Sequence, residues 1–506
     1  MAKYSPTAEQ IDCLDSFNTG ATMKIVAGAG TGKTSTLIML SESTARRGLY
    51  VVFNKTAQED ATRRMPGNIE VRTAHSLAYR DVVGNTNFKS KLTRLTAKIA
   101  AQAAGLTRPL DLGFVDVPIH TAAYYLMDWV TRFSASADNK IDINTAPTSA
   151  IIQWLTTDDH GAPSDASVLG VKHMMLPMVS KLWDQMTDFD SDFPATHDTY
   201  LKLWSMSNPV LKKYDFILYD EAQDASPAML AVVTQQPVQQ IYVGDPHQQI
   251  YSWRGAVNAM QAIPTTRTAH LTQSFRFGRA IAEQANLALD LCRSDFKIIG
   301  AGSGSSAHGR AVLCRTNSGI ISVLDRHNDL SKVHIAGGTG NITKLLDAMS
   351  ELKSKGSTNH PDLINFHSWV NFVAYTKEKK SDLTNILKMT GGGNTIGKMK
   401  DMLAGTSQEG RGAEVTVSTA HKSKGLEWSH VELHDDFKVP EDQGWSSEEA
   451  RLLYVAVTRP MKTLSLPKRI AMALENGCPE KSEHSMDGYV EPVTKSAAKE
   501  LCDFPC

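Results

Sequence analysis

The stretch AGAGTGKT at residues 27–34 combines alternating glycines with a lysine and a threonine, residue types suited to holding phosphate groups. The glycines leave backbone N–H groups free to converge on phosphate oxygens, and the positive end of a helix dipole would add to the attraction. Lys33 would reach the β- and γ-phosphates of a nucleotide, and Thr34 would hold Mg²⁺. The residues predicted to surround the phosphates are Ala27, Gly28, Ala29, Gly30, Thr31, Gly32, Lys33, Thr34 and Ser35. An apolar run, MKIVA, precedes the stretch and a helical pattern follows it, which favours a phosphate loop over a glycine-rich turn that binds nothing.

A magnesium-bound phosphate loop needs a carboxylate at the end of a neighbouring strand, and the segment DFILYDEAQD at 215–224 supplies one. Asp220 would complete the coordination of Mg²⁺, and Glu221 would orient or deprotonate the attacking water. By itself, an Asp-Glu pair after a strand is often a solvated turn. Together with the phosphate loop, it predicts hydrolysis of a nucleoside triphosphate.

Short apolar runs, each followed at once by polar or glycine-rich residues, recur along the chain and would position these side chains. They lie at residues 23–27, 50–54, 215–220, 240–245, 311–317, 414–421 and 429–435. Runs this short and rich in Val, Ile and Tyr are typical of buried strands, and the helical patterns between them indicate an α/β fold with parallel sheets. Because ligands bind beyond the carboxyl ends of the strands in such folds, the chemistry is expected at the polar tails of these runs.

Two long segments break this pattern and are expected to be mainly helical insertions. The first lies between Tyr79 and about Trp204, and the second lies between about Ile320 and Gly412. A Gly/Ser-rich stretch precedes the second segment and GGG interrupts it; both stretches are predicted to be flexible loops.

The composition is that of a globular protein with more than one domain: 506 residues, of which 42% are hydrophobic and 21% are charged. The formal net charge of −1 means that a polyanion would have to bind in a local groove. Six scattered cysteines without a CxxC pair argue against a disulfide framework or a zinc site. No signal-peptide core or membrane span is apparent. We expect a soluble protein, cytoplasmic in a bacterial or virus-infected cell or nuclear in a eukaryote.

Four segments beyond the phosphate loop resemble motifs II, III, V and VI of superfamily 1A helicases, most of all the UvrD/Rep/PcrA group. They read DEAQD, VGDPHQQIYSWRGA at 243–256, TAHKSKGLEW at 419–428 and LLYVAVTRP at 452–460. Motif I of that group commonly begins with alanine, which explains Ala27 at a position where phosphate loops usually have glycine. VVFNKTAQEDA at 51–61 and VRTAHSLAYR at 71–80 are similar to the F-box DNA helicase branch, although no F-box is apparent.

The resemblance implies two RecA-like P-loop motor domains that bind ATP and Mg²⁺ between them, with mainly helical accessory insertions. Motor domain 1A is expected at residues 1–85 and 200–275, and motor domain 2A at 276–319 and 411–506. The insertions at 86–199 and 320–410 correspond in position to the 1B and 2B accessory domains of the family.

The resemblance also implies the residues that contact the rest of the nucleotide. Gln10 matches the glutamine that reads adenine, and Glu427 matches a residue that contacts the ribose. Phe275 can stack on adenine, although the asparagine of the family's usual Asn-Tyr-Arg is replaced here by serine. Gln248 matches the glutamine that senses the γ-phosphate, with the neighbouring Gln249 as the alternative assignment.

Two arginines match the motif IV and motif VI arginines that project from the second motor domain onto the γ-phosphate. They are Arg276, in SFRFG, and Arg459, in VAVTRP, where Pro460 replaces the usual alanine. Guanidinium groups are permanently charged and planar, which suits them to phosphate oxygens. The residues expected to carry catalysis are therefore Lys33, Glu221, Gln248, Arg276 and Arg459.

A track for single-stranded nucleic acid is the third implication of the resemblance. Tyr251 and Trp253 match base-stacking aromatics, and Arg254 matches a residue that couples the track to the nucleotide. The residues that match contacts to the DNA strand are Asn54, Thr73, His75, His421 and Lys424. Phe53 directly precedes Asn54, unlike the family's stacking phenylalanine, so stacking on DNA and burial in a strand remain equal alternatives for its side chain. His430, Glu432 and His434 share one strand face, which we interpret as an interior face and not as a metal site beyond Mg²⁺.

The sequence therefore predicts an ATP-dependent DNA helicase or translocase that moves on single-stranded DNA, with 3′ to 5′ movement implied by the resemblance. Single-stranded DNA and single–double-strand junctions are the expected partners, together with replication or recombination proteins, in DNA repair, recombination or replication. The alternatives are a translocase that displaces proteins with little unwinding and a non-catalytic nucleic-acid-binding protein on a decayed motor fold. An RNA helicase is less favoured, because nothing in the sequence reads a 2′-hydroxyl.

Overall fold

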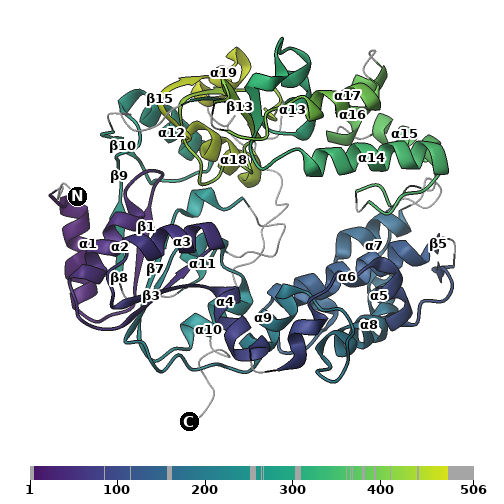
Figure 1. The fold of residues 1–506 in the computed structure, drawn as a ribbon, viewed down its shortest axis with the longest axis horizontal. Coiled ribbons are helices and arrows are strands. Elements are labelled where there is room, and N and C mark those ends of the chain that lie inside the picture. Colours follow the sequence, from purple (N-terminus) through teal and green to yellow (C-terminus); the bar gives the residue numbers. More distant parts are fainter. Residues whose placement is uncertain are drawn as a thin grey trace.

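Two parallel sheets with helices packed on them form the frame of the protein in the computed structural model (Figure 1). The structure describes residues 5–476 apart from 85, 114, 157–161, 251–257, 264, 266, 303–308, 361, 365, 367, 379–381, 392–394, 411 and 441–443. The α/β class with parallel sheets and helical insertions is as the sequence predicted. No helix in the described part of the chain has both the length and the apolar character needed to span a membrane.

The first sheet has six parallel strands in the order β3-β2-β6-β7-β1-β8. The strands are β1 Met23–Ala27, β2 Gly48–Val52, β3 Ile69–Thr73, β6 Phe216–Tyr219, β7 Gln239–Gly244 and β8 Arg267–Leu271. One face of this sheet packs on α1 Ala8–Asn18, α2 Lys33–Glu42 and α3 Lys55–Arg64. The side chains of β2 alternate between the faces, so Tyr50 faces these helices while Val51 belongs to a second core on the other side. Burial on both faces explains why β2 and β6 read as continuous apolar runs.

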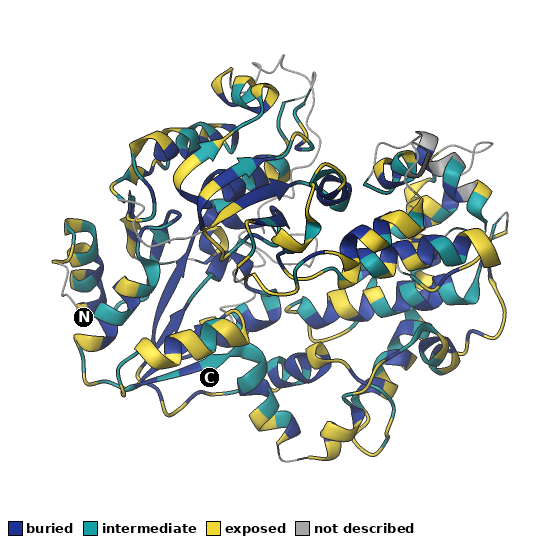
Figure 2. Ribbon diagram, turned by 45° about the horizontal axis from the view of Figure 1, so that its top comes forward, coloured by how far each residue is buried: buried dark blue, intermediate teal, exposed yellow. Residues whose placement is uncertain are grey.

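The second sheet has five parallel strands in the order β12-β13-β11-β14-β15. The strands are β11 Arg310–Cys314, β12 Val333–Ile335, β13 Val415–Thr419, β14 Trp428–Leu433 and β15 Pro460–Ser465. Helices α12 Arg279–Leu291, α18 Ser447–Val457 and α19 Lys468–Glu475 cover one face, and α13 Asn317–Asp325 packs on the other. In Figure 2 the strands of both sheets are mostly buried, whereas the helices carry exposed outer faces. The functional side chains must therefore come from the ends of the strands.

The strand predictions differ from the structure in three respects. The predicted run at 50–54 forms a strand two residues earlier, at Gly48–Val52, which leaves Phe53 and Asn54 in the turn that follows. β12 lies inside the segment 320–410 that was expected to be an insertion, because a strand of only three residues gives no periodicity to detect. Strands β3, β8 and β15 were also missed, since their sequences IEVRT, RTAHL and PMKTLS are rich in polar residues.

The first insertion is a bundle of helices whose core is continuous with one face of the first sheet. Its helices are α5 Ala97–Ala104, α6 Ile119–Ala135, α7 Thr148–Leu155, α8 Asp165–Thr187 and α9 His197–Met206, and a short antiparallel pair, β4 Leu110–Asp111 and β5 Asp116–Val117, joins them. Lys202 is buried, and its ammonium group donates to the carbonyl oxygens of Ser136 (2.7 Å) and Asp138 (2.5 Å). The shared apolar core anchors the bundle to the sheet. The domain limit expected at 199/200 falls within α9. The expected domain limits remain predictions.

The second insertion consists of α14 Gly340–Lys355, α15 Trp369–Glu378, α16 Asp382–Gly391 and α17 Ile396–Ala404. It packs against the second sheet, and its far end reaches the first insertion (Figure 1). The hydroxyl of Tyr124 on α6 donates to the carbonyl oxygen of Asn359 (2.8 Å), and the His120 ring lies 3.3 Å from the carbonyl oxygen of Ile364. The two sheets therefore face each other on one side of the molecule, and the two insertions meet on the other.

Candidate functional site

The predicted phosphate loop connects β1 to α2, as its sequence requires. Gly30 and Gly32 have left-handed φ angles of +73° and +79°, which glycine adopts without strain. Thr31 is buried, and its hydroxyl donates to the carbonyl oxygen of Gly28 (2.9 Å), which fixes the bend of the loop. α2 begins at Lys33, so the positive end of its dipole points into the loop. The local conformation is therefore that of an anion-binding loop, and no single residue in it departs from the predicted order of strand, turn and helix.

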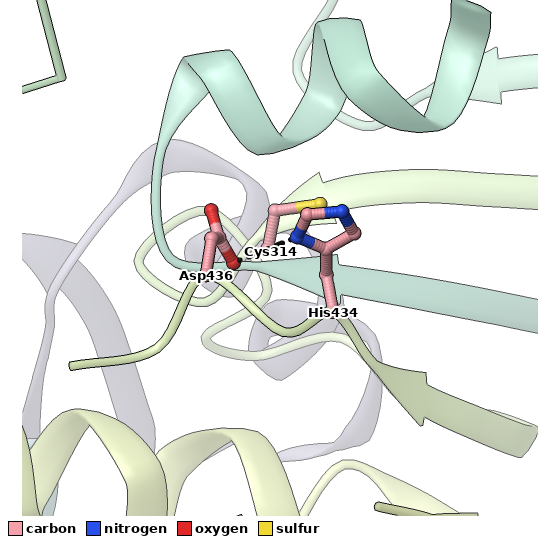
Figure 3. Close-up of side chains that lie close together, drawn as sticks. All are labelled: Cys314, His434 and Asp436. Atoms are coloured by element: carbon pink, nitrogen blue, oxygen red, sulfur yellow. Dashed lines mark ion pairs between the residues drawn. The ribbon is translucent and has the colours of Figure 1, made fainter. Parts of the chain in front are cut away.

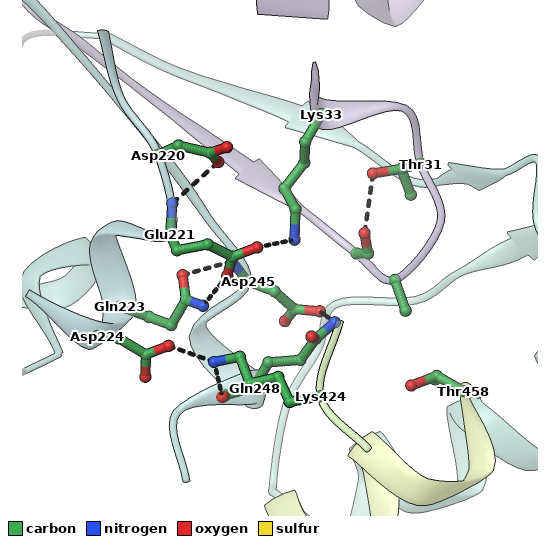
Figure 4. A network of polar contacts seen from close by, with 12 residues as sticks. Thr31, Lys33, Asp220, Glu221, Gln223, Asp224, Asp245, Gln248, Lys424 and Thr458 are labelled. Atoms are coloured by element: carbon green, nitrogen blue, oxygen red, sulfur yellow. Dashed lines mark hydrogen bonds and ion pairs between the residues drawn. The ribbon is translucent and has the colours of Figure 1, made fainter. Parts of the chain in front are cut away.

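The carboxylates of Asp220 and Glu221 follow β6 and lie beside the loop (Figure 4). Asp220 accepts hydrogen bonds from the hydroxyl of Tyr50 (2.6 Å) and the backbone N–H of Glu221 (2.9 Å). Glu221 has a left-handed φ of +50°, an uncommon conformation for a residue with a side chain, and its carboxylate lies 3.7 Å from the ammonium group of Lys33. This strained backbone turns the Glu221 carboxylate toward the phosphate loop.

The two neighbouring carboxyl groups have opposite pKa shifts. Burial and then the charge of Glu221 raise the pKa of Asp220. Burial also acts to raise the pKa of Glu221, but the positive charges of Lys33 and Lys424 outweigh it and hold that pKa below its usual range. Glu221 is therefore the member of the pair that stays ionised, as a group that orients or deprotonates water must be.

Gln248 lies in the same network, through Asp245 at the end of β7 (Figure 4). Its side-chain amide donates to the Asp245 carboxylate (2.8 Å), while the backbone N–H of Asp245 donates to Gln223, whose amide in turn donates to Glu221. The neighbouring Gln249 instead accepts a hydrogen bond from Arg451 (3.2 Å). The geometry therefore favours Gln248 over Gln249 as the residue directed toward the nucleotide.

Arg276 approaches the phosphate loop from the side of the second sheet, and Arg459 lies close enough to Arg276 for their charges to interact. A side chain placed on Gly30 would come within 2.5 Å of the Cβ of Arg276, so the two backbones are in close contact. The guanidinium group of Arg276 donates to Glu427 (3.0 Å) and to the carbonyl oxygen of Thr458 (3.0 Å). Burial and then the charge of Arg276 lower the pKa of Arg459 to about 9.

Arg459 is 1% exposed, and within the described residues its guanidinium group donates to carbonyl and hydroxyl oxygens. It donates to the carbonyl oxygens of Val455 (2.8 Å) and Leu426 (3.4 Å) and to the hydroxyl of Thr458 (3.1 Å). No carboxylate lies at ion-pair distance from it among the residues that the structure describes. A buried cation held in this way has capacity for an anion.

Gln10 and Phe275 flank the helical end of the loop. A side chain on Gly32 would lie 3.6 Å from the Phe275 ring and 3.7 Å from the Gln10 amide. The Gln10 amide donates to Thr36 (3.1 Å) and its carbonyl oxygen accepts from the backbone of Thr7 (3.1 Å), which fixes its orientation. Phe275 is 45% exposed, an unusual fraction for phenylalanine and one suited to stacking. Glu427, expected at the ribose, is paired with Arg276 here.

The residues expected along the DNA track lie at the ends of the strands but differ in accessibility. Asn54 and Thr73 accept hydrogen bonds from the first turns of α3 and α4 (Ala74–Ala78), so both act as helix caps. The side chain of His75 is half-exposed, and its ring lies 3.1 Å from Asp198. Phe53 is 52% exposed, so the burial considered as one of its two alternatives is wrong. Tyr251, Trp253 and Arg254 lie outside the described residues.

Lys424 differs from its expected position on the track. Its side chain is 12% exposed, and its ammonium group pairs with the buried Asp224 and donates to the carbonyl oxygen of Gln248 (2.8 Å). This places Lys424 at the interface between the strand ends of the two sheets, called the cleft below, in the polar network beside the phosphate loop (Figure 4). The nearby His421 is partly buried, and burial followed by the charge of Arg315 lowers its pKa to about 4. At neutral pH it is therefore an uncharged ring and not a phosphate-binding cation.

Four residues of the network were not singled out by the sequence analysis: Gln223, Asp224, Asp245 and Tyr454. All four lie within segments that resemble helicase motifs, but the resemblance assigned no function to any of them. The hydroxyl of Tyr454, on α18, donates to Asp245 (2.9 Å) and accepts from the backbone N–H of Ala29 (3.3 Å). It is thus a direct hydrogen-bonded contact between a helix of the second sheet and the phosphate loop.

Cys314, His434 and Asp436 lie together at the ends of β11 and β14 (Figure 3), with one potential ligand atom from each within 4.8 Å of the others. The Asp436 carboxylate already accepts hydrogen bonds from the backbone N–H groups of Arg315 (2.8 Å) and Thr316 (2.9 Å). Burial raises the pKa of the Cys314 thiol, which disfavours the thiolate. The cluster therefore serves to fix the turn that leads into α13.

The strand face suggested by His430, Glu432 and His434 was wrongly interpreted as an interior one. His430 is exposed and Glu432 pairs with Arg310, so the first two residues face outward, and His434 lies beyond the end of β14.

Two family models match the chain in separate regions. A model described as the UvrD-like helicase C-terminal domain matches residues 309–468, and one described as an AAA domain matches residues 10–254. The chain is 30% identical over 534 aligned residues to the F-box DNA helicase protein 1 of Schizosaccharomyces pombe, covering 93% of this chain and 58% of the relative. It is 30% identical over 522 aligned residues to the F-box DNA helicase 1 of Gallus gallus, covering 90% of this chain and 49% of that protein. The chain thus spans about half the length of these two relatives.

Proposed function

The chain belongs to the UvrD-like helicases of superfamily 1, and from that premise we propose that it is an ATP-dependent DNA helicase that moves along single-stranded DNA. The observation that carries the proposal is the close contact of Arg276, from the side of the second sheet, with Gly30 of the phosphate loop, with Arg459 close enough to Arg276 and Glu221 for their charges to interact. A cleft with a phosphate loop on one side and arginines on the other can change its width when a nucleotide binds and is hydrolysed.

The side chains present fit ATP with Mg²⁺. Asp220 and Thr34 offer a carboxylate and a hydroxyl, the oxygen ligands that Mg²⁺ prefers. Lys33 lies at the start of α2, where it can reach phosphate oxygens, and Arg459 has no carboxylate at ion-pair distance in the described part of the chain. When bound, Mg²⁺ would neutralise part of the negative charge of the phosphates.

We assign the catalytic roles as follows. Lys33 and the backbone N–H groups of the loop bind the phosphates, and Glu221 orients or deprotonates the attacking water. Arg276 and Arg459 stabilise the negative charge that develops on the transferred phosphoryl group. Gln248 senses the γ-phosphate, and its hydrogen bond to Asp245 connects it to the rest of the network. Gln10 and Phe275 hold the adenine and Glu427 contacts the ribose, after exchanging its ion pair with Arg276 for the nucleotide.

The proposed DNA strand crosses the ends of both sheets. Asn54, Thr73 and His75 on the first sheet and His421 on the second lie at strand ends, where the strand would pass. Stacking of bases on aromatic side chains, with Phe53 as an exposed candidate and Tyr251 and Trp253 as predicted ones, makes such binding independent of sequence. Each cycle of ATP hydrolysis would advance the strand, and movement from 3′ to 5′ rests on the family resemblance.

The experiment measures ATP hydrolysis and strand separation on duplexes with a 3′ tail, a 5′ tail or no tail. We expect hydrolysis that single-stranded DNA stimulates and unwinding only from the 3′ tail. Unwinding only from the 5′ tail contradicts the direction, and hydrolysis without any unwinding indicates a translocase that displaces proteins instead. A wild-type protein that does not hydrolyse ATP contradicts the proposal as a whole.

Substitution Lys33→Ala provides the matched test of the site. We expect it to abolish ATP hydrolysis and unwinding while single-stranded DNA still binds. Lys355→Ala, which removes a 70% exposed lysine on α14, serves as the control and should leave both activities unchanged. Forked, gapped and nicked DNA in the same assay would test the further proposal that the protein acts in repair, recombination or replication.

A further inference from the structure

A single hydroxyl group joins three parts of the cleft that are far apart in the sequence. Tyr454 lies at the start of the last turn of α18, on the side of the second sheet. Its hydroxyl accepts from the backbone N–H of Ala29, in the phosphate loop (3.3 Å), and donates to the carboxylate of Asp245, after β7 (2.9 Å). Its side chain is fully buried, so water does not compete for these bonds.

The direction of both hydrogen bonds is fixed by the chemistry of the partners. Burial and then the charge of Asp245 raise the pKa of Tyr454, so the phenol keeps its proton at every physiological pH. A protonated hydroxyl can donate to one acceptor and accept from one donor at the same time. An amide and a carboxylate are such a pair, which means that both bonds form together.

Both arginines donate hydrogen bonds to the C-terminal end of α18 or to the residue that follows it. Arg459 follows the helix and donates to the carbonyl oxygen of Val455 (2.8 Å), the residue after Tyr454. The carbonyl oxygen of Thr458 accepts from Arg276 (3.0 Å), and the hydroxyl of Thr458 donates to the carbonyl oxygen of Tyr454 (2.9 Å). Any shift of Tyr454 against the phosphate loop is thus transmitted to both guanidinium groups.

The bond to Asp245 extends the connection to Gln248. Tyr454 and Gln248 donate to the same carboxylate oxygen of Asp245, at 2.9 Å and 2.8 Å. Removing the hydroxyl would leave the Ala29 N–H without its partner and free the carboxylate to turn. The orientation of Gln248 would then be less well defined.

We propose that Tyr454 is a positioning residue that holds Gln248, Arg276 and Arg459 in place relative to the phosphate loop, and so links closure of the cleft to hydrolysis. This inference rests on the proposed ATP hydrolysis. Tyr454 itself does not contact the nucleotide and is not a catalytic residue. Its phenyl ring can remain in place when the hydroxyl is removed, which separates its bonding role from its packing role.

The test compares the wild-type protein with Tyr454→Phe and the control Tyr242→Phe. Tyr242 is also fully buried and donates to a side-chain oxygen, of Gln240, at 2.9 Å, but it lies within β7 and away from the cleft. We expect Tyr454→Phe to lower the kcat of DNA-stimulated ATP hydrolysis by about 10- to 100-fold, the range for loss of a hydrogen bond to a charged group. The KM for ATP and the Kd for ADP should stay within about twofold, because contacts made equally in the ground state are retained.

A double-mutant cycle with Gln248→Ala tests the route of the effect. Because Tyr454 acts in part through Asp245 and Gln248, Tyr454→Phe should lower kcat clearly less in the Gln248→Ala background than in the wild type. Equal losses in both backgrounds would overturn that route.

The outcomes separate this inference from the proposed function. An active wild type with Tyr454→Phe indistinguishable from Tyr242→Phe overturns the role of Tyr454 alone. A lower unfolding midpoint together with parallel losses in kcat and ADP binding overturns it in favour of a structural role. A wild type without DNA-stimulated ATP hydrolysis overturns both proposals.

Discussion

The two sides of the cleft hold their charges in different ways. On the first side, formed at the strand ends of the first sheet, each carboxylate has a partner: Tyr50 for Asp220, Lys33 for Glu221 and, from across the cleft, Lys424 for Asp224. On the second side, Arg459 is buried among carbonyl and hydroxyl oxygens and, within the described residues, has no carboxylate at ion-pair distance.

This difference indicates which side needs a ligand to balance its charge. Desolvating a guanidinium group without a counterion is unfavourable, and burial, followed by the charge of Arg276, lowers the pKa of Arg459. The carboxylates of the first side have their partners within the protein. The Arg459 guanidinium group of the second side would receive its counterion from a bound ligand. Phosphate groups held by the loop opposite would provide this charge.

The largest effect is expected for Arg459→Met, which tests the second side. Loss of an arginine that stabilises transition-state charge should lower kcat for ATP hydrolysis by about 10³- to 10⁵-fold. Because the substitution removes a buried charge that lacks a counterion, the unfolding midpoint without nucleotide should stay the same or rise. Arg279→Met, at a 90% exposed position, is the control for both measurements. A large fall in the midpoint of Arg459→Met would mean that its charge is balanced within the protein.

A somewhat smaller effect is expected for Glu221→Gln on the first side. Loss of the carboxylate proposed to orient or deprotonate water should lower kcat by about 10²- to 10⁴-fold, while the side chain keeps its size and can still bond to Gln223. Titration with a fluorescent ADP analogue should give an unchanged Kd. Glu283→Gln, at an exposed position on α12, provides the control, and a variant with normal turnover would exclude Glu221 from catalysis.

Lys424→Met tests whether the first side depends on an internal ion pair. Asp224 would be left buried without a counterion, so the free energy of unfolding should fall by about 3–5 kcal/mol, measured by chemical denaturation. Lys355→Met, on the surface of α14, should change it little. If Lys424→Met and Arg459→Met affected stability equally, the contrast between the two sides would not hold.

Tyr50→Phe should have the smallest effect of the four. Asp220 would lose one hydrogen bond but keep the bond from the backbone of Glu221, so a loss of about 1.5–3 kcal/mol in the free energy of unfolding is the upper range. The concentration of Mg²⁺ that gives half-maximal ATP hydrolysis should rise, since the loss of this bond raises the pKa of Asp220 further. An unchanged Mg²⁺ requirement would argue that Asp220 is not a ligand.

The sequence was most informative where function depends on neighbours along the chain. The phosphate loop between β1 and α2 and the carboxylates after β6 were located because strand, turn and polar tail are consecutive. The α/β class followed from the same pattern. Polar or very short strands such as β3 and β12 were missed, because their stability comes from pairing with distant partners and not from their own composition.

The contacts between the two sides of the cleft were beyond the reach of sequence patterns. Tyr454 is separated from Ala29 by 425 positions, and Lys424 is separated from Asp224 by 200. The residue types gave no indication that these residues pair. Lys424 was predicted to lie on the DNA track, whereas its ammonium group contacts Asp224 and Gln248 inside the cleft. For Phe53, the position after an apolar run left stacking on DNA and burial as equal predictions, and only the structure shows that the side chain is exposed.

The most direct test of the cleft is the stabilisation that a mimic of the γ-phosphate gives beyond ADP alone. The measurement is the unfolding midpoint with Mg²⁺ and ADP, with and without aluminium fluoride, in the wild type and in Arg459→Met. We predict that aluminium fluoride raises the midpoint further in the wild type, and that Arg459→Met shows the rise with ADP but no additional rise. A full additional rise in Arg459→Met would contradict the claim that the second side of the cleft is completed by the phosphate charge.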